Sequence, residues 1–130
     1  MKKKILIVVA DYYKDIASSL INSAKLYLKN KSSLSINFIR VPGVFEIPVT
    51  ISKNIKKYDA FISLGCVIKG ETPHFDIISK STTNAIMNLS ISSNKPIGNG
   101  IITCLNMKQA IDRRAKGKEA AVALKSVLSQ

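Results

Sequence analysis

The sequence predicts an α/β fold: a three-layer αβα sandwich in which helices cover both faces of a four-stranded parallel sheet. Apolar runs of strand length alternate with segments of helix length along the chain, in the order βαβαβαβα. The first run, residues 5–10, is continuous and rich in β-branched residues, as in a parallel strand that is buried on both faces. Because crossovers between parallel strands are right-handed, we expect the strand order 2-1-3-4.

Two strands and two helices are predicted in the first half of the chain. Residues 12–29 follow the first strand and carry apolar residues at four-residue spacing, which indicates an amphipathic helix. Leu34–Val41 alternates along its length and is predicted to be a strand nearer an edge of the sheet. A Pro-Gly pair ends it, and residues 44–57 are predicted to be helical, with Pro48 near the first turn, where proline is tolerated.

The second half repeats the alternation. Residues 59–64 are a buried apolar run that predicts the third strand, and residues 74–94 predict the third helix. Ile97–Cys104 is predicted to be the fourth strand, although glycines interrupt it. Asn106 is suited to cap a final helix that runs to residue 128, with a possible break at Gly117.

The composition is that of one domain, residues 1–130, since 46% hydrophobic residues can build one core. No apolar run approaches the length of a membrane span, and the run ended by Asp11 is too short for a secretion signal. We therefore expect a cytoplasmic protein. Cys66 and Cys104 should be reduced and semi-buried, and with the single histidine they are too few for a metal site.

The chain has a formal net charge of +12. A high positive charge of this kind is common in proteins that bind nucleic acids. Here the charge comes from 17 lysines and only three arginines, which are spread along the chain. No stretch interleaves aromatic and basic residues as RNA-binding sheets do. We therefore expect a lysine-rich solvated surface, with no nucleic-acid partner and no membrane partner.

Residues 65–76 are the most informative stretch. They connect the third predicted strand to the third helix and contain His74, the only histidine. Thr72 followed by Pro73 is typical of a helix start, with a hydroxyl as cap and the proline at the first helical position. A helix N-terminus favours an anion, and the imidazole beside it can carry a proton. In open α/β sheets such chemistry lies at the carboxyl ends of the strands, beside the switch point between the first and third strands.

Three segments, in this order and at this spacing, resemble the lumazine synthase family. They are VPGVFEIP at residues 41–48, LGCVIKGETPHFD at residues 64–76, and PIGNGIIT at residues 96–103 followed by QAIDR at residues 109–113. The likeness covers nearly the whole chain. It implies a flavodoxin-like fold of the kind that the apolar runs predict.

The resemblance also implies a reaction. The family condenses 5-amino-6-(D-ribitylamino)uracil with 3,4-dihydroxy-2-butanone 4-phosphate to 6,7-dimethyl-8-ribityllumazine, a step of riboflavin biosynthesis that uses no cofactor or metal. An imine forms, phosphate is eliminated and the ring closes. Such a sequence needs proton transfer and, above all, two substrates held together.

The resemblance assigns roles to particular residues. His74 matches the family histidine that moves protons, although a lone histidine can also be structural. Gly70, Glu71 and Thr72 match the family's phosphate loop, although the same residues could form only an ordinary helix cap. Arg113 matches an arginine that grips the same phosphate from a neighbouring subunit, and a guanidinium fork suits that task. The adjacent arginine, Arg114, is the alternative if the helix register differs.

Further substrate contacts are implied in the same segments, at Tyr12, Val44, Phe45, Glu46, Val67, Ile68, Asn99 and Lys116. Tyr12 takes the place of an aromatic that stacks on the pyrimidine, but it could also be a lid on the core. Glu46 matches a ribityl-chain contact, although acidic residues are common in first turns. Asn99 stands where some relatives carry phenylalanine, and it could be a turn asparagine.

The resemblance implies a ring of five subunits with active sites at the subunit interfaces. Two departures bear on assembly: the short N-terminal strand that many relatives lend to a neighbour is missing, and the connection after Arg113 is several residues shorter. Both changes remove material that could link rings. A free pentamer is therefore expected rather than a shell of 60 subunits.

Three alternatives remain open at this point. An enzyme like the archaeal type of riboflavin synthase would share the fold, but its reaction has no phosphorylated substrate for the loop. A flavodoxin-like flavin-binding protein needs a phosphate loop rich in hydroxyl groups and glycine after the first strand, where this chain has DYYKD. A basic binding module without catalysis would leave His74 unexplained.

Overall fold

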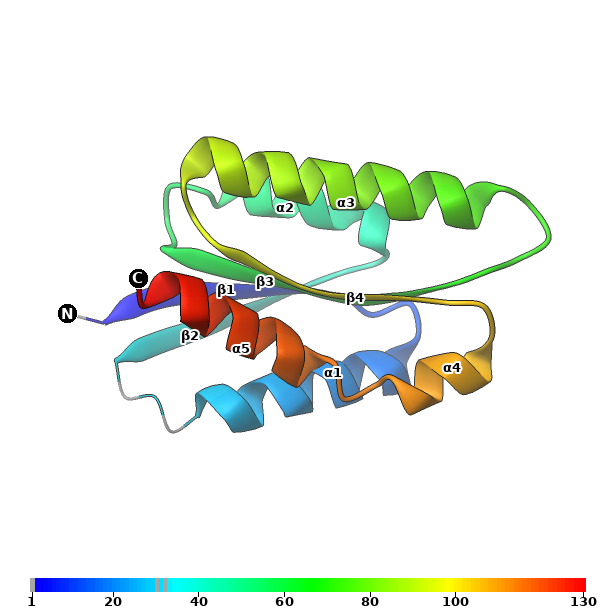
Figure 1. Ribbon diagram of the computed structural model, residues 1–130, viewed down its shortest axis with the longest axis horizontal. Coiled ribbons are helices and arrows are strands. Elements are labelled where there is room, and N and C mark those ends of the chain that lie inside the picture. The colour runs from blue at the N-terminus through cyan, green and yellow to red at the C-terminus, as the bar shows by residue number, and fades with distance from the viewer. Residues whose placement is uncertain (1, 30, 32) are drawn as a thin grey trace.

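A parallel sheet of four strands runs through the centre of the molecule, with the predicted order β2-β1-β3-β4 (Figure 1). This computed structural model describes residues 2–29, 31 and 33–130. The strands are β1 (Lys3–Ala10), β2 (Leu34–Val41), β3 (Ala60–Ile68) and β4 (Ile97–Cys104). The strand β2, predicted to lie near an edge, is an edge strand, and β4 forms the other edge.

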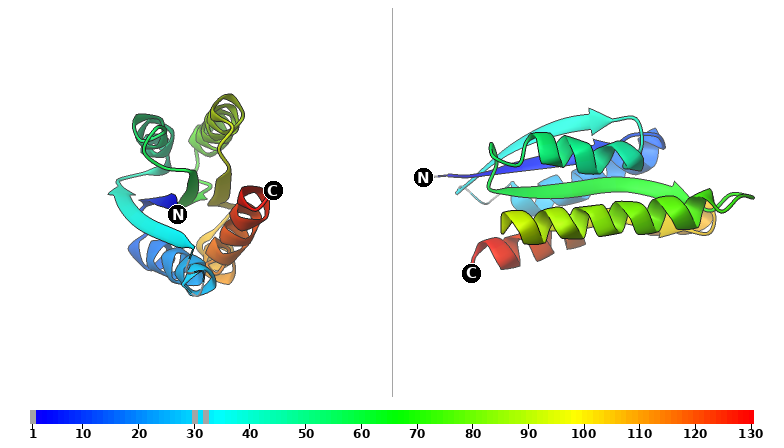
Figure 2. Two further views of the ribbon diagram at one scale, coloured as in Figure 1. Left: turned by 90° about the vertical axis from the view of Figure 1, so that its left-hand side faces the viewer. Right: turned by 90° about the horizontal axis from the view of Figure 1, so that it is seen from above.

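Helices cover both faces of the sheet (Figure 2). They are α1 (Lys14–Leu28), the 3₁₀ turn η1 (Val44–Glu46), α2 (Ile47–Lys53), α3 (His74–Ser93), α4 (Met107–Asp112) and α5 (Gly117–Leu128). One layer holds α2 and α3, and the other holds α1, α4 and α5 (Figure 1). The three-layer prediction is therefore confirmed.

The sequence of β1 explains why both layers have a core. Alternate side chains of a strand point to opposite faces. Ile5, Ile7 and Val9 belong to the core cluster that contains the apolar side of α1 and α5. Leu6 and Val8 belong to the second cluster, beneath η1, α2 and α3. A continuous apolar run is what a strand covered on both faces requires.

The end of β3 and the extent of the second helix differ most from the prediction. The strand β3 continues to Ile68 rather than ending at residue 64, because it pairs with β4 as far as Cys104. The helix predicted over residues 44–57 begins as the turn η1 and ends at Lys53, where the side-chain amide of Asn54 donates to the carbonyl of Thr50. The possible break in the final helix is confirmed, since it is divided into α4 and α5 just before Gly117.

Helix α3 begins at His74, as predicted, but Thr72 is not its capping residue. Pro73 occupies the capping position, and His74 is the first helical residue. The Thr72 hydroxyl still accepts a hydrogen bond from the N–H of His74, at 3.4 Å. The Thr72 hydroxyl therefore lies next to the N-terminus of α3.

Close backbone packing holds α5 in place. A Cβ atom at Gly117 would lie 2.0 Å from the carbonyl oxygen of Leu20 in α1, and one at Gly98 would lie 2.4 Å from the carbonyl oxygen of Ala120. Both approaches are possible only without a side chain. Glycine therefore lets α5 sit directly against β4 and α1. No helix of the described residues is long and apolar enough to cross a membrane.

Candidate active site

A cavity of about 690 Å³ opens at the carboxyl ends of β1 and β3, at the switch point of the strand order. It brings together six of the residues that the sequence predicted: Tyr12, Val44, Phe45, Val67, Ile68 and His74. They come from four separate segments of the chain. The volume lies within the range of small-molecule sites, so the fold creates a site where the strand order predicts one.

His74 lies at one rim of this cavity, directly after the loop of residues 70–72. His74 lines it as the first residue of α3 and is exposed. Gly70, Glu71 and Thr72 form the exposed loop that leads to it. The helix that follows has 20 residues, so its aligned peptide dipoles give its N-terminus a partial positive charge. The loop can therefore accept an anion beside a proton-transferring group.

Two adjacent tyrosines form another part of the wall. The ring of Tyr12 is 75% exposed, and that of Tyr13 meets it edge to face with ring centroids 4.9 Å apart. Tyr13 also packs against the core beneath α1. Burial, followed by the neighbouring Cys66 and Tyr12, raises the pKa of Tyr13. Tyr13 therefore supports the exposed ring of Tyr12, which is free to stack on a flat ligand.

Glu46 does not line the main cavity. Its Oε1 accepts a hydrogen bond from the N–H of Gly43 at 3.0 Å, which fixes the turn η1. It lines a smaller groove of about 330 Å³ between α2 and α3. Phe45 lines both depressions. Glu46 thus has a structural partner of its own, and a role in substrate binding stays a prediction.

The floor of the cavity contains a cysteine that sequence reasoning did not place there. Cys66 lines the cavity, and both cysteines are free and buried. Burial, the neighbouring Cys104 and a hydrogen bond to Cys104 raise the pKa of the Cys66 thiol to about 12. The thiol is therefore protonated at neutral pH and serves as a wall group rather than a nucleophile.

Arg113, Lys116 and Asn99 lie elsewhere. They line a separate depression of about 260 Å³ along β4, the edge strand. Arg113 donates from its guanidinium to the carbonyl of Thr103 at 3.1 Å, and Lys116 forms an ion pair with Glu119 at 3.5 Å. Within one chain, these residues do not share the cavity that His74 lines. Arg113, Lys116 and Asn99 do lie together in the depression along β4.

Arg114 points to a different surface from Arg113. It lines a groove of about 370 Å³ between the start of α1 and α4, together with Tyr13 and Met107. Arg113 instead lies with Lys116, the other basic residue that the resemblance implies. Which of the two arginines binds a phosphate therefore stays a prediction.

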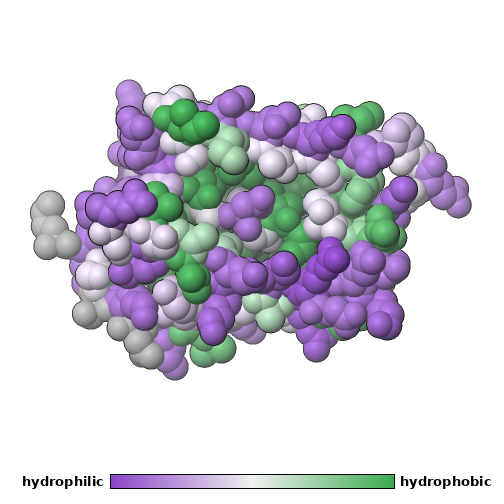
Figure 3. All heavy atoms as spheres, viewed as in Figure 1, coloured by the Kyte–Doolittle hydropathy of each residue, from purple (hydrophilic) through white to green (hydrophobic). Residues whose placement is uncertain are grey.

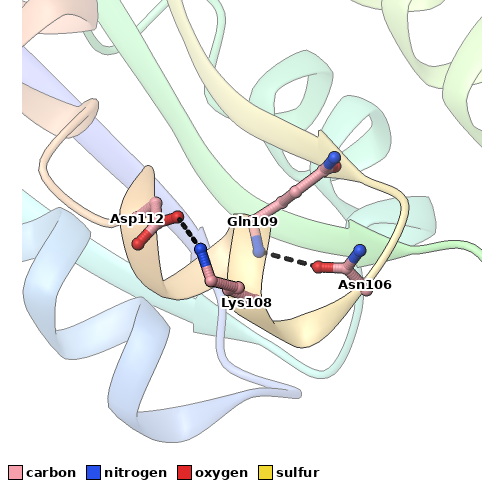
Figure 4. Close-up of polar contacts among 4 residues, drawn as sticks. All are labelled: Asn106, Lys108, Gln109 and Asp112. Atoms are coloured by element: carbon pink, nitrogen blue, oxygen red, sulfur yellow. Dashed lines mark hydrogen bonds and ion pairs between the residues drawn. The ribbon is translucent and has the colours of Figure 1, made fainter.

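Arg113 follows the last residue of the short helix α4, whose local polar contacts are drawn in Figure 4. Asn106 caps α4 as predicted, since its Oδ1 accepts from the N–H of Gln109 at 2.9 Å. Lys108 and Asp112 form an ion pair one turn apart, at 3.5 Å. An exposed pair of this kind contributes little, so the cap is the main local support of α4.

The other cavity residues that the sequence analysis missed are apolar or glycine: Gly43, Ile77 and Ile78. The two isoleucines line the cavity from the first turns of α3, and only the three-dimensional position of the helix reveals this. Nor do three or more histidine, cysteine or acidic side chains of the described residues come together in a group that could hold a metal ion.

Comparison with known proteins agrees with the geometry. The family model described as 6,7-dimethyl-8-ribityllumazine synthase matches residues 2–130. A protein of that name from Agrobacterium fabrum is 42% identical over 116 residues, which cover 84% of this chain and 78% of that protein. Its namesake from Corynebacterium kroppenstedtii is 35% identical over 127 residues, 92% and 79% of the two chains. The Limosilactobacillus reuteri protein of the same name is 38% identical over 126 residues, 94% and 83%.

Proposed function

This chain belongs to the 6,7-dimethyl-8-ribityllumazine synthase family and is an enzyme of riboflavin biosynthesis; we propose that its reaction takes place in the cavity at the carboxyl ends of β1 and β3. The reaction joins 5-amino-6-(D-ribitylamino)uracil to 3,4-dihydroxy-2-butanone 4-phosphate. The observation that carries the proposal is the meeting of Tyr12, Val67, Ile68 and His74 around one cavity. The family membership favours this reaction over the riboflavin synthase and flavin-carrier alternatives.

Each wall of the cavity suits one part of the substrates. The exposed ring of Tyr12 can stack on the pyrimidine, and the backbone of Val67 and Ile68, where β3 ends, can hydrogen-bond to its edge. The ribityl chain would extend along η1, past Val44 and Phe45 and towards Glu46. Holding the pyrimidine amine beside the ketone makes imine formation effectively unimolecular, so proximity supplies much of the rate.

The butanone phosphate would place its anionic group at Gly70, Glu71 and Thr72. There the N-terminus of α3 offers N–H donors, and the Thr72 hydroxyl offers another contact. His74 then lies beside the bonds that break and can carry protons during phosphate elimination and ring closure.

Apart from Lys69, which directly precedes the loop, the described residues of a single chain supply no lysine or arginine to this site. Of the described residues that line the cavity, none is a lysine or arginine. A phosphate group calls for such a partner, and Arg113 and Lys116 lie together on another surface of the chain. We infer that a neighbouring subunit brings its own Arg113, with Lys116 and Asn99 beside it, to the open side of the cavity.

Exposed apolar side chains support association. Phe45, Val49 and Ile77 near the cavity are 57–69% exposed, as are Met87 and Ile91 farther along α3. A hollowed, largely apolar band also lies on the face that carries β4, between α3 and α5 (Figure 3). Contiguous apolar surface of this kind marks interaction sites on a small protein. A closed ring in which each subunit completes its neighbour's site would bury it.

We expect a free ring of five subunits. The high positive charge opposes packing such rings into a larger shell. Light scattering at physiological salt should give the mass of five chains. A mass near sixty chains would contradict the free ring, and a stable, active monomer would contradict the shared site. The free thiols fit the cytoplasm as the place of action, because that compartment keeps cysteines reduced.

Mixing the purified protein with both substrates tests the function directly. Fluorescent lumazine and one equivalent of inorganic phosphate should appear together. A correctly folded, correctly assembled protein that forms no lumazine would refute the proposal. Purification of a yellow protein that dithionite reduces would instead favour the flavin-binding alternative.

Replacing His74 with alanine should leave a folded enzyme with reduced turnover. A positioned acid–base group contributes about 10²–10⁴-fold, and this reaction depends mainly on proximity, so we expect a loss of about a hundredfold or less in kcat. Steady-state lumazine formation measures it. Lys80→Gln, an exposed change on the same helix, is the control. Complete loss of turnover with unchanged substrate binding would show a larger role for the imidazole.

A further inference from the structure

The net charge of +12 is concentrated at one end of the molecule. Ten lysines lie where the strands begin and the helices end, and we call this surface the lysine pole: Lys2, Lys3, Lys4, Lys29, Lys31, Lys53, Lys56, Lys57, Lys95 and Lys125. Asp59 is the only acidic side chain among them. Six of the other seven lie around the opposite end of the sheet, and Glu119 is paired with Lys116 beside β4.

The lysine pole is one continuous surface. Its lysines come from separate segments, but the segments touch. Three hydrogen bonds join them: Lys3 N–H to the Ser33 carbonyl (2.9 Å), Asp59 N–H to the Lys4 carbonyl (2.8 Å) and the Lys95 ammonium to the Ile55 carbonyl. All strands of a parallel sheet begin at the same end, and this end lies next to both chain termini (Figure 1). The lysines are spread along the sequence, and the fold brings ten of them together.

Helix electrostatics explains only part of this gathering. Lysine in a last turn favours the helix dipole, and this accounts for Lys53 and Lys125. It does not account for Lys2, Lys3 and Lys4 at the start of β1, nor for the lysines in the turn before β3. The last turn of α3 contains no basic residue at all.

The charges of the lysine pole are not neutralised within the chain. The three ion pairs among the described residues join Arg40 to Asp11, Lys108 to Asp112 and Lys116 to Glu119, and none includes a lysine of the pole. Like charges gathered without counter-charges oppose the compact state. They also form the electrostatic footprint of a surface that binds a polyanion.

We propose that the lysine pole binds double-stranded nucleic acid through its phosphates, without reading sequence. The pole holds no arginine, since all three arginines lie elsewhere, so the bidentate contacts that arginine makes to guanine are absent. Lysine ammonium groups act as point charges and suit phosphates. This activity is separate from lumazine formation, and it replaces the expectation of no nucleic-acid partner that the sequence suggested.

A duplex fits the pole better than a single strand or a membrane. Single-strand sites add aromatic platforms to a basic groove, whereas here the Tyr27 ring lies beneath the Lys31 ammonium and the Tyr58 ring packs on Phe61. Membrane binding through an amphipathic helix uses the long apolar side of that helix. The helices run along the sheet, so the pole presents their ends (Figure 2).

The pole and the active site lie at opposite ends of the strands. The cavity opens where β1 and β3 end, and the lysines gather where they begin. A bound duplex would therefore leave the cavity open. We expect lumazine formation to continue at the same rate when nucleic acid is bound.

The test compares two triple variants of equal charge by fluorescence anisotropy with a labelled DNA duplex of mixed sequence. Lys3→Gln/Lys56→Gln/Lys57→Gln removes three charges from the pole. Lys80→Gln/Lys108→Gln/Lys118→Gln removes three exposed charges elsewhere. Lumazine formation and circular dichroism check that each variant is folded. An RNA duplex and vesicles of anionic phospholipid serve as alternative probes.

For the unmodified protein we expect binding in the micromolar range at about 50 mM salt, with affinity falling steeply as salt rises. The pole variant should lose about tenfold or more in affinity, and its salt slope should fall by about 2–3, near 0.9 for each phosphate contact removed. The control variant should stay within about threefold of the unmodified protein. An RNA duplex that binds as well as DNA would support contacts to phosphates alone.

Three results would overturn the proposal. Equal losses in the two variants would show that net charge, and not the pole, determines binding. Tighter binding to the vesicles than to the duplexes would assign the pole to a membrane. Absence of binding to any duplex at low salt would leave the lysines a solvated surface.

Discussion

Replacing Arg113 with alanine is expected to raise the KM for the butanone phosphate by about tenfold to a hundredfold and to leave the KM for the pyrimidine nearly unchanged. The phosphate would keep its hydroxyl and backbone donors but lose its only arginine. Loss of one partner from a hydrogen bond to a charged group costs about 1.5–3 kcal/mol, which corresponds to this range of KM. Steady-state kinetics with each substrate varied in turn measures both constants.

Arg114→Ala is the matched control, since Arg114 lies in the groove beside α1 and away from Lys116. If Arg114→Ala raised the KM and Arg113→Ala did not, the assignment would be reversed. Rings mixed from Arg113→Ala subunits and Thr72→Ala subunits add a test of the shared site. Some interfaces in such rings would pair an intact loop with an intact arginine, so mixing should recover part of the lost activity. No recovery in mixed rings would contradict a site completed by a neighbour.

Replacing Gly117 with alanine is expected to lower the free energy of unfolding by about 3 kcal/mol. The new Cβ atom would lie 2.0 Å from the carbonyl oxygen of Leu20 and 2.6 Å from the hydroxyl oxygen of Ser23. The first contact is with the backbone of α1, so relief requires α5 to move away from α1. Overpacking of a tight contact typically costs 1–3 kcal/mol, occasionally more.

Urea unfolding at a fixed protein concentration measures this loss, because association contributes to the apparent stability. Gly70→Ala is the control, since a Cβ atom there would meet nothing within 4 Å. We expect its unfolding free energy to stay within about 0.5 kcal/mol of the unmodified protein, as at most open surface positions. A Gly117→Ala variant as stable as Gly70→Ala would mean that α5 can shift freely.

Every strand could be predicted, because β1 and β3 contain continuous apolar runs, β2 alternates along its length, and β4 is an apolar segment that glycines interrupt. The end of β3 could not, since Cys66, Val67 and Ile68 are strand residues only through their pairing with β4. In the sequence alone, these residues lie between Gly65 and Lys69-Gly70, which predicts a loop. The early end of α2 has a similar cause, because the turn after Lys53 is held by tertiary and side-chain contacts.

The cavity shows the same division. Tyr12, Val44 and His74 were predicted from motifs, and they do meet at one cavity. Tyr13 was missed, because a second aromatic beside the first looks like ordinary core until its ring is seen edge-on to Tyr12. The lysine pole could not be predicted from the sequence for a different reason. Its members are up to 123 positions apart, from Lys2 to Lys125, and only the parallel sheet brings them together.

Asn99 has a consequence for how this chain behaves before it assembles. Its Oδ1 accepts a hydrogen bond from the N–H of Ile101 at 3.0 Å, on the side of β4 that no other strand covers. The open edge of a sheet is a template on which a second chain can extend the sheet and begin an aggregate. By occupying one of the donors of that edge, Asn99 disrupts the template at its middle. We therefore expect an asparagine here to make strand-to-strand association of unassembled chains less favourable than a phenylalanine, which has no oxygen to accept from this donor.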